Sequence, residues 1–148
     1  MRTKRHAIAV VLALSIVSQA ACDKNRIHEA AKASDRMATL IGSAIDVKRQ
    51  LGQAGAISRE EELVLTNHLL TANTQVKNFN NYARTLTTDD AATRLNLAEA
   101  FNKVTMAVNA LSNQAIFPIK DPEAKKRLMA ILNSINASII IIDSALKG

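Results

Sequence analysis

The stretch that decides the fold is LTNHLLTANTQVKNFNNYARTL, residues 65–86. Its apolar residues recur at alternating steps of four and three, the spacing that places side chains on one face of an α-helix. The residues of this stripe are Leu65, Leu69, Ala72, Val76, Phe79, Ala83 and Leu86. Most of the remaining residues are polar, so the stretch predicts a helix with one buried face.

Three further segments carry the same repeat, and turn or cap residues separate all four. The predicted helices cover about residues 25–52, 59–86, 89–115 and 122–147. Ser58 and Glu61 have the spacing of a capping box, in which the hydroxyl and the carboxylate satisfy free backbone amides. Asp121 before Pro122 predicts the start of the fourth helix.

The third helix is expected to begin at the Thr87-Thr88-Asp89-Asp90 segment, which supplies both a cap and negative charge. Four helices of similar length with short connections can bury their stripes together around one axis. We therefore predict an all-α protein, an antiparallel up-down-up-down four-helix bundle. A helical hairpin that needs a partner to complete its core is the alternative.

The first 21 residues have the three parts of a secretory signal peptide. Residues 1–6 hold three fixed positive charges, residues 7–17 are almost entirely aliphatic, and residues 18–21 are small or polar. The aliphatic run is shorter than the roughly 20 apolar residues that a membrane-spanning helix needs. We expect residues 1–21 to be removed on export and residues 22–148 to form the mature bundle.

Ala20, Ala21 and Cys22 resemble the end of the lipobox of bacterial lipoproteins. The resemblance implies cleavage before Cys22 and attachment of a lipid to its sulfur. The sequence departs from the family pattern at Gln19, where lipoboxes carry an aliphatic residue. Cys22 is the only cysteine, and a lone thiol is a liability in an oxidising compartment unless it is chemically occupied. Cleavage after Ala20 by ordinary signal peptidase, giving a soluble periplasmic protein, is the alternative.

Asp23 follows the cysteine directly. In lipoproteins of the enteric type, an aspartate at this place resembles a signal for retention at the inner membrane. The resemblance therefore implies a lipid anchor on the periplasmic side of the inner membrane, with the outer membrane as the alternative.

The net charge of +6 does not indicate nucleic-acid binding. Removal of Arg2, Lys4 and Arg5 with the signal peptide leaves +3. An excess that small, with no aromatic platform and no continuous basic stripe, is not the pattern of a surface that follows phosphates.

No arrangement of residues in the sequence indicates catalysis, a metal or a cofactor. Beyond the signal peptide the histidines are His28 and His68, and neither belongs to a Glu-x-x-His or Cys-x-x-Cys-His motif. Helical bundles use such motifs to hold di-iron centres or haem. The adjacent acids at residues 60–62 project in different directions and suit the start of a helix. We expect a non-enzymatic protein.

An apolar segment, Ile116-Phe117-Pro118-Ile119, connects the third and fourth helices where polar turn residues are usual. In the predicted topology it lies, with residues 52–57, at the end farthest from Cys22, called here the distal end. Either these loops cover the end of the core, or they form a docking patch for an envelope protein. The candidate patch comprises Ile116, Phe117, Ile119, Lys125, Lys126 and Arg127, with Lys120 at its rim.

Four consecutive isoleucines occupy residues 139–142. The outer two lie on the buried stripe, so Ile140 and Ile141 are expected to point away from it. Asp143 and the short length of the run argue against a membrane span. Lipid contact or self-association would bury the pair, although isolated exposed isoleucines are also common.

These features together predict a membrane-tethered lipoprotein whose bundle acts as a protein-interaction module. The contact surface is expected at the distal loops or along the polar face of the second helix, which is rich in Asn and Thr. The alternative is a periplasmic carrier or sensor that binds a small apolar ligand between its helices. Self-association into a homo-oligomer is compatible with either function.

Overall fold

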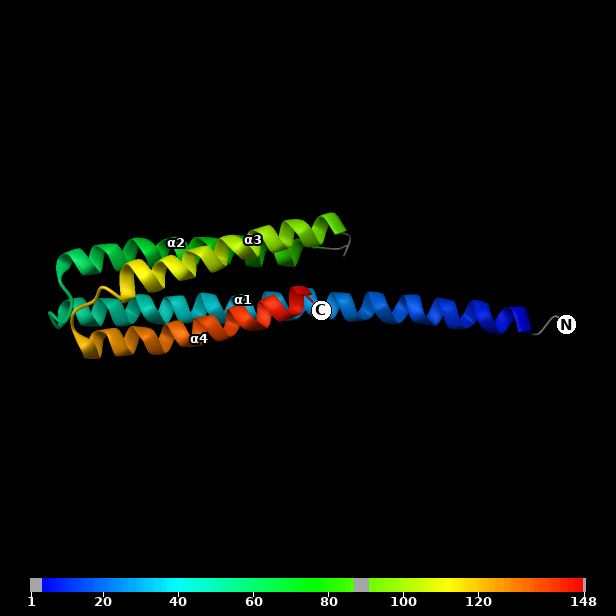
Figure 1. Cartoon of the computed structure of the whole chain (residues 1–148), viewed down its shortest axis with the longest axis horizontal. Helices are drawn as coiled ribbons and strands as arrows, with labels where there is room; N and C mark the ends of the chain where they lie inside the picture. Colours follow the sequence, from blue (N-terminus) through cyan, green and yellow to red (C-terminus); the bar gives the residue numbers. More distant parts are fainter. Residues whose placement is uncertain (1–3, 87–90, 148) are drawn as a thin grey trace.

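The protein is all-helical, as predicted, with four long helices. The computed structural model describes the backbone of residues 4–86 and 91–147, and the side chains of residues 26–86 and 92–147. The elements are α1 (Lys4–Gln53), α2 (Arg59–Thr85), α3 (Ala91–Ala110), the π-helix η1 (Leu111–Ile116) and α4 (Pro122–Lys147) (Figure 1).

Helix α1 is longer than expected, because it begins at Lys4 rather than near residue 25. No glycine or proline precedes Gly42, so nothing in the local chemistry interrupts the helix. Its N-terminal part extends well beyond the other three helices (Figure 1). The side chains of Gln19, Cys22 and Asp23 lie outside the described residues, and the signal peptide at residues 1–21 remains a prediction.

Helix α1 ends in a Schellman motif, the usual C-terminal stop built on a left-handed residue. The N–H of Gly55 donates to the carbonyl of Gly52 at 3.1 Å, and the N–H of Ala56 donates to that of Leu51 at 2.9 Å. Gly55 has a φ of +69°, which glycine adopts without steric cost. The chain can therefore reverse direction within a few residues and enter α2.

The predicted capping box of α2 is confirmed. The Ser58 hydroxyl accepts a bond from the Glu61 N–H at 3.2 Å, and the Glu61 carboxylate accepts one from the Ser58 N–H at 2.7 Å. At the start of α4, the Asp121 carboxylate accepts from the N–H of Ala124 at 2.7 Å, with Pro122 in the first helical position. The predicted cap of α3, Thr87 to Asp90, lies outside the described residues.

The core is built from the predicted stripes. On α2 every stripe residue from Leu65 to Ala83 is buried, and Leu86 packs against the core in a half-buried position. The apolar repeat of the third segment is also buried in α3 and η1, and its residues are Leu97, Phe101, Val104, Val108, Leu111 and Ala115. The rings of Phe79 and Phe101 meet with centroids 5.8 Å apart and planes tilted by 54°, a favourable aromatic geometry that joins α2 to α3.

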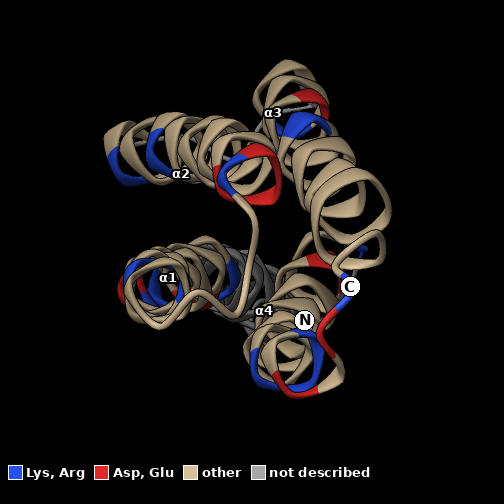
Figure 2. Ribbon diagram, turned by 90° about the vertical axis from the view of Figure 1, so that its left-hand side faces the viewer, with Lys and Arg blue, Asp and Glu red and all other residues tan. Residues whose placement is uncertain are grey.

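The helices pack unevenly around this core. Helix α1 packs closely against both α4 and α2, α3 packs mainly against α2, and the contact between α3 and α4 is the slightest. The connection from α1 to α2 and that from η1 to α4 lie at the same end of the molecule (Figure 1). Figure 2 looks along the helices from this end. The distal loops are therefore neighbours in space as well as at one end of the predicted bundle.

A π-helix ends the third helical segment, where an unbroken α-helix to residue 115 was expected. The N–H of Phe117 donates to the carbonyl of Ser112 at 2.9 Å, the five-residue spacing of a π-turn. Two adjacent residues, Ala115 and Ile116, are buried in this wider turn. The π-turn thus places Ile116 in the core, where the α-helical repeat would place only Ala115.

Candidate functional site

The distal end is held together by hydrogen bonds that converge on Glu61. In addition to its capping bond, the Glu61 carboxylate accepts a bond from the N–H of Lys120 at 3.0 Å. The N–H groups of Ser58 and, secondarily, Lys120 hold the pKa of Glu61 below its ordinary value of 4.5, because they stabilise the ionised carboxylate. One acidic side chain therefore both caps α2 and ties the loop before α4 to it.

The apolar loop divides into a buried part and an exposed part. Ile116 and Ile119 are buried in the core, so their assignment to an accessible docking patch was wrong. They close the distal end of the core, which is the alternative interpretation of the loop. Phe117 lies between them and is 53% exposed. Of the three apolar residues in the candidate patch, only Phe117 is available to a partner.

The cations of the candidate patch lie on the first turns of α4. Lys126 lies 4.0 Å from the Glu123 carboxylate, and the Arg127 guanidinium donates to the Gln50 side chain of α1 at 2.9 Å. Lys125 is half-buried. Figure 2 shows basic and acidic residues side by side at the starts of both α2 and α4. The charges at the distal end are therefore mixed rather than purely basic.

The isoleucine pair on α4 points outward as predicted, since Ile140 is 66% exposed and Ile141 is 41% exposed. By length and composition alone, the helix Pro122–Lys147 that carries the pair is apolar enough to cross a membrane. Buried core helices meet the same criterion, and Leu132 and Ile135 of α4 are buried in this core. Lipid contact and self-association of the isoleucine pair remain predictions.

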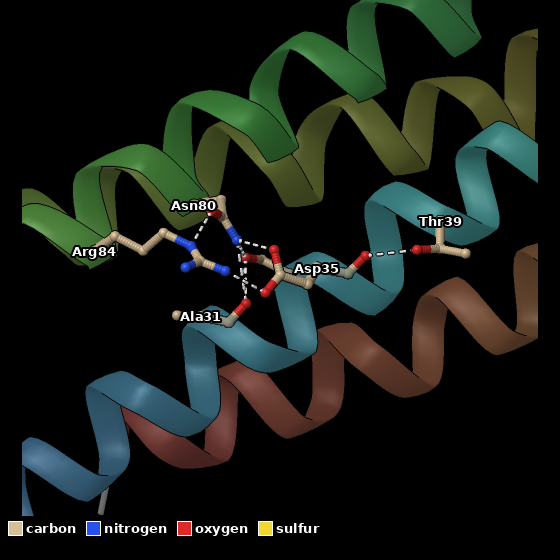
Figure 3. Close-up of polar contacts among 6 residues, drawn as sticks. Ala31, Asp35, Thr39, Asn80 and Arg84 are labelled. Carbon is tan, nitrogen blue, oxygen red and sulfur yellow. Dashed lines mark hydrogen bonds and ion pairs between the residues drawn. The ribbon is translucent and has the colours of Figure 1, made fainter.

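A polar cluster that the sequence analysis did not identify joins α1 to α2 (Figure 3). The Asn80 amide nitrogen lies within hydrogen-bond distance of the Ala31 carbonyl at 3.2 Å, the Ser34 hydroxyl at 2.6 Å and the Asp35 carboxylate at 2.8 Å. Arg84 completes the cluster by donating to the Asn80 carbonyl at 2.7 Å and to Asp35 at 2.5 Å. These bonds fix the lengthwise register of the two helices.

An open groove of about 520 Å³ runs between α2 and α3. Its lining residues are Gln75, Asn78, Phe79, Tyr82, Asn96, Glu99, Ala100 and Lys103. Most of these side chains are polar, and small-molecule sites are usually concave and mostly apolar. The groove is therefore a poor match to the predicted alternative of an apolar ligand held between helices.

The histidines and acidic residues in the described part of the chain do not form a metal site. No group of three or more His, Cys, Asp or Glu residues in this part could hold a metal ion. His28 is exposed and His68 is half-buried beside the core stripe. No buried side-chain nitrogen or oxygen among the described residues lacks a hydrogen-bond partner.

No family model, no curated protein and no solved structure matches the chain. The functional assignment therefore depends on the residues and geometry described above.

Proposed function

We propose that residues 22–148 form an antiparallel up-down-up-down bundle that is exported, acylated at Cys22 and held on the periplasmic side of the inner membrane. The bundle acts there as a non-enzymatic protein-interaction module, and Phe117 is the centre of its contact surface. The observation that carries the proposal is the exposure of Phe117, at 53%, between two buried isoleucines.

The backbone on both sides of the exposed Phe117 is held by hydrogen bonds. Its own N–H is bonded to Ser112, and three residues later the N–H of Lys120 is bonded to Glu61. An aromatic ring on a fixed backbone loses little conformational entropy on binding, and aromatic side chains are enriched among the residues that dominate binding energies. The mixed charges of the neighbouring helix ends provide a polar rim of the kind that surrounds such residues.

The tether is supported by the tripartite signal sequence and by the extent of the core. Among the described side chains, Ala30 is the first core residue. The described core therefore begins close to Cys22 in the sequence, so a lipid on that residue would hold the bundle near the membrane surface. The distal end would then face away from the membrane, toward partners in the periplasm.

Photocrosslinking in intact cells tests this function. A photoreactive amino acid replaces Phe117 in the full-length chain, and a matched chain carries it at Leu95, which is 71% exposed on α3. We expect one discrete adduct with a different protein from position 117 and none from position 95. Failure to form that adduct, or the same adducts from both positions, would contradict an interaction centred on Phe117.

A further inference from the structure

The outward face of α2 carries a second heptad repeat, separate from the stripe that is buried in the core. Its residues, called here the outer stripe, are Leu63, Asn67, Leu70, Thr74, Lys77 and Asn81. They follow one another at steps of four and three, and all six are exposed. Leu63 is 62% exposed and Leu70 is 53% exposed. Two leucines one heptad apart on a solvent-facing helix surface are unexplained by the packing of the bundle.

The outer stripe has the features of a coiled-coil seam. If Leu63 and Leu70 occupy the d positions, Asn67 occupies the a position between them and Thr74 the next a position. The flanking e and g positions are uncharged, and they hold Val64, Thr66, Thr71, Asn73, Asn78 and Asn80. Within residues 63–81, Lys77 is the only charged residue on the stripe or its flanks, and Glu60 and Arg84 continue the repeat at its two ends. The central part of the seam therefore lacks the ionic pairs that usually select a different partner chain.

This charge pattern favours a second copy of the same chain. In a twofold pair each surface meets itself, so a charged surface places like charges together. The α4 start, with adjacent Lys125, Lys126 and Arg127, would be penalised in this way. The outer stripe confines this penalty to Lys77, which at a d position would face its own equivalent. The side chain of Asn67 carries both a donor and an acceptor with which it can pair with its own equivalent.

We propose that α2 packs against α2 of a second copy of this chain through the outer stripe, with the two helices parallel. Leu63 and Leu70 of each copy then lie against their equivalents, and Asn67 pairs with Asn67. The pairing rests on the stripe alone. Its parallel direction rests on the proposed function, because two copies anchored at residue 22 in one membrane extend from it in the same direction.

Cysteine crosslinking of the full-length chain in intact cells tests the pairing. Asn67→Cys and Asn81→Cys are made singly, and Asn133→Cys, exposed on α4, is the matched control. A short thiol-reactive crosslinker is applied, and the unsubstituted chain measures any product that arises through Cys22. We expect a homodimer adduct from position 67 and from position 81, well above the yield from position 133.

A disrupting variant controls for chance collisions in the membrane. Leu63→Asn with Leu70→Asn, in the Asn67→Cys chain, should lower the adduct yield at least about tenfold, since each lost leucine contact is worth more than one decade of affinity. Both leucines are exposed, so the helical circular dichroism of the purified variant should not change.

Three outcomes would overturn the proposal. Equal yields at positions 67 and 133 would show that the stripe is not an interface. An adduct whose second component is a different protein would assign the stripe to another partner. Crosslinking only when the position 67 and position 81 chains are mixed would show antiparallel pairing, and would count against a shared membrane anchor while leaving the Phe117 test unaffected.

Discussion

The substitution Phe79→Ala is expected to remove a large part of the stability of the bundle. Phe79 is fully buried on α2, and its ring contacts that of Phe101. Truncating a buried phenylalanine costs about 3–5 kcal/mol in lost transfer energy and cavity formation. The total free energy of unfolding of a domain this size is about 5–15 kcal/mol, so the variant should retain only part of it.

The matched control is Phe117→Ala, the same chemical change at a half-exposed position. Because about half of this side chain is already in water, its cost should stay below about 1 kcal/mol. Both variants are made in residues 23–148, which contain every described core residue. Urea unfolding is followed by circular dichroism, and a slope of about 2 kcal/mol/M converts the expected loss for Phe79→Ala into a fall in midpoint of roughly 2 M. Similar midpoints for the two variants would refute the burial pattern on which the fold and the Phe117 surface both depend.

Three further predictions use the same unfolding assay. Gly55→Ala should destabilise the fold by about 1 kcal/mol, because alanine resists the left-handed φ. Gly42→Ala, inside α1 with open space around the new Cβ, should stabilise the fold by up to about 1 kcal/mol. Effects of equal sign in the two variants would contradict the Schellman motif. Asn80→Ala should lower the free energy of unfolding by about 1–2 kcal/mol, because it removes several bonds to α1. Arg84→Ala should cost less, because its ion pair is half-exposed and worth less than about 1 kcal/mol. A larger loss from Arg84→Ala would show that Asn80 is not the main link between the two helices. Glu61→Gln should have a lower free energy of unfolding than the parent above pH 4.5. This difference in stability should disappear as the pH falls through the lowered pKa of Glu61. A difference that stays constant down to pH 3 would show that the ionised Glu61 carboxylate is not its cause.

The helices and their buried faces could be predicted because they are local and periodic. The α2 stripe needs only the spacing of Leu65 and its successors, and the capping box needs only Ser58 and Glu61. Such signals depend on a few neighbouring residues and are not altered by the rest of the fold. The outward direction of Ile140 and Ile141 followed from the same periodicity.

Features that depend on distant parts of the chain were missed. The Asn80 cluster joins residues more than 40 positions apart, and no periodicity marks it. The π-turn at η1 shifts the helical repeat by one residue, which buries Ile116 beside Ala115. For this reason the sequence left two interpretations of the loop open, and the burial of Ile116 and Ile119 favours closure of the core, with Phe117 as the exposed residue.

The placement of the helices also changes which surfaces are candidates for binding a partner. The cations at residues 125–127 include one that is half-buried and one that is bonded to α1, so they form a weaker patch than their sequence suggests. Conversely, the Asn- and Thr-rich face of α2 became a stronger candidate contact surface, because the exposed Leu63 and Leu70 lie on it one heptad apart. The exposure of each side chain in the structure separates these two cases.

Intact-mass measurement of the protein purified from the membranes of expressing cells tests the lipid tether at Cys22 most directly. We expect a chain that begins at Cys22 and carries the mass of a diacylglycerol group on its sulfur. Cys22→Ser, the control, should accumulate with residues 1–21 still attached, because lipoprotein processing requires the cysteine. A parent chain that begins at Ala21 with a free thiol, or that retains residues 1–21, would contradict the tether.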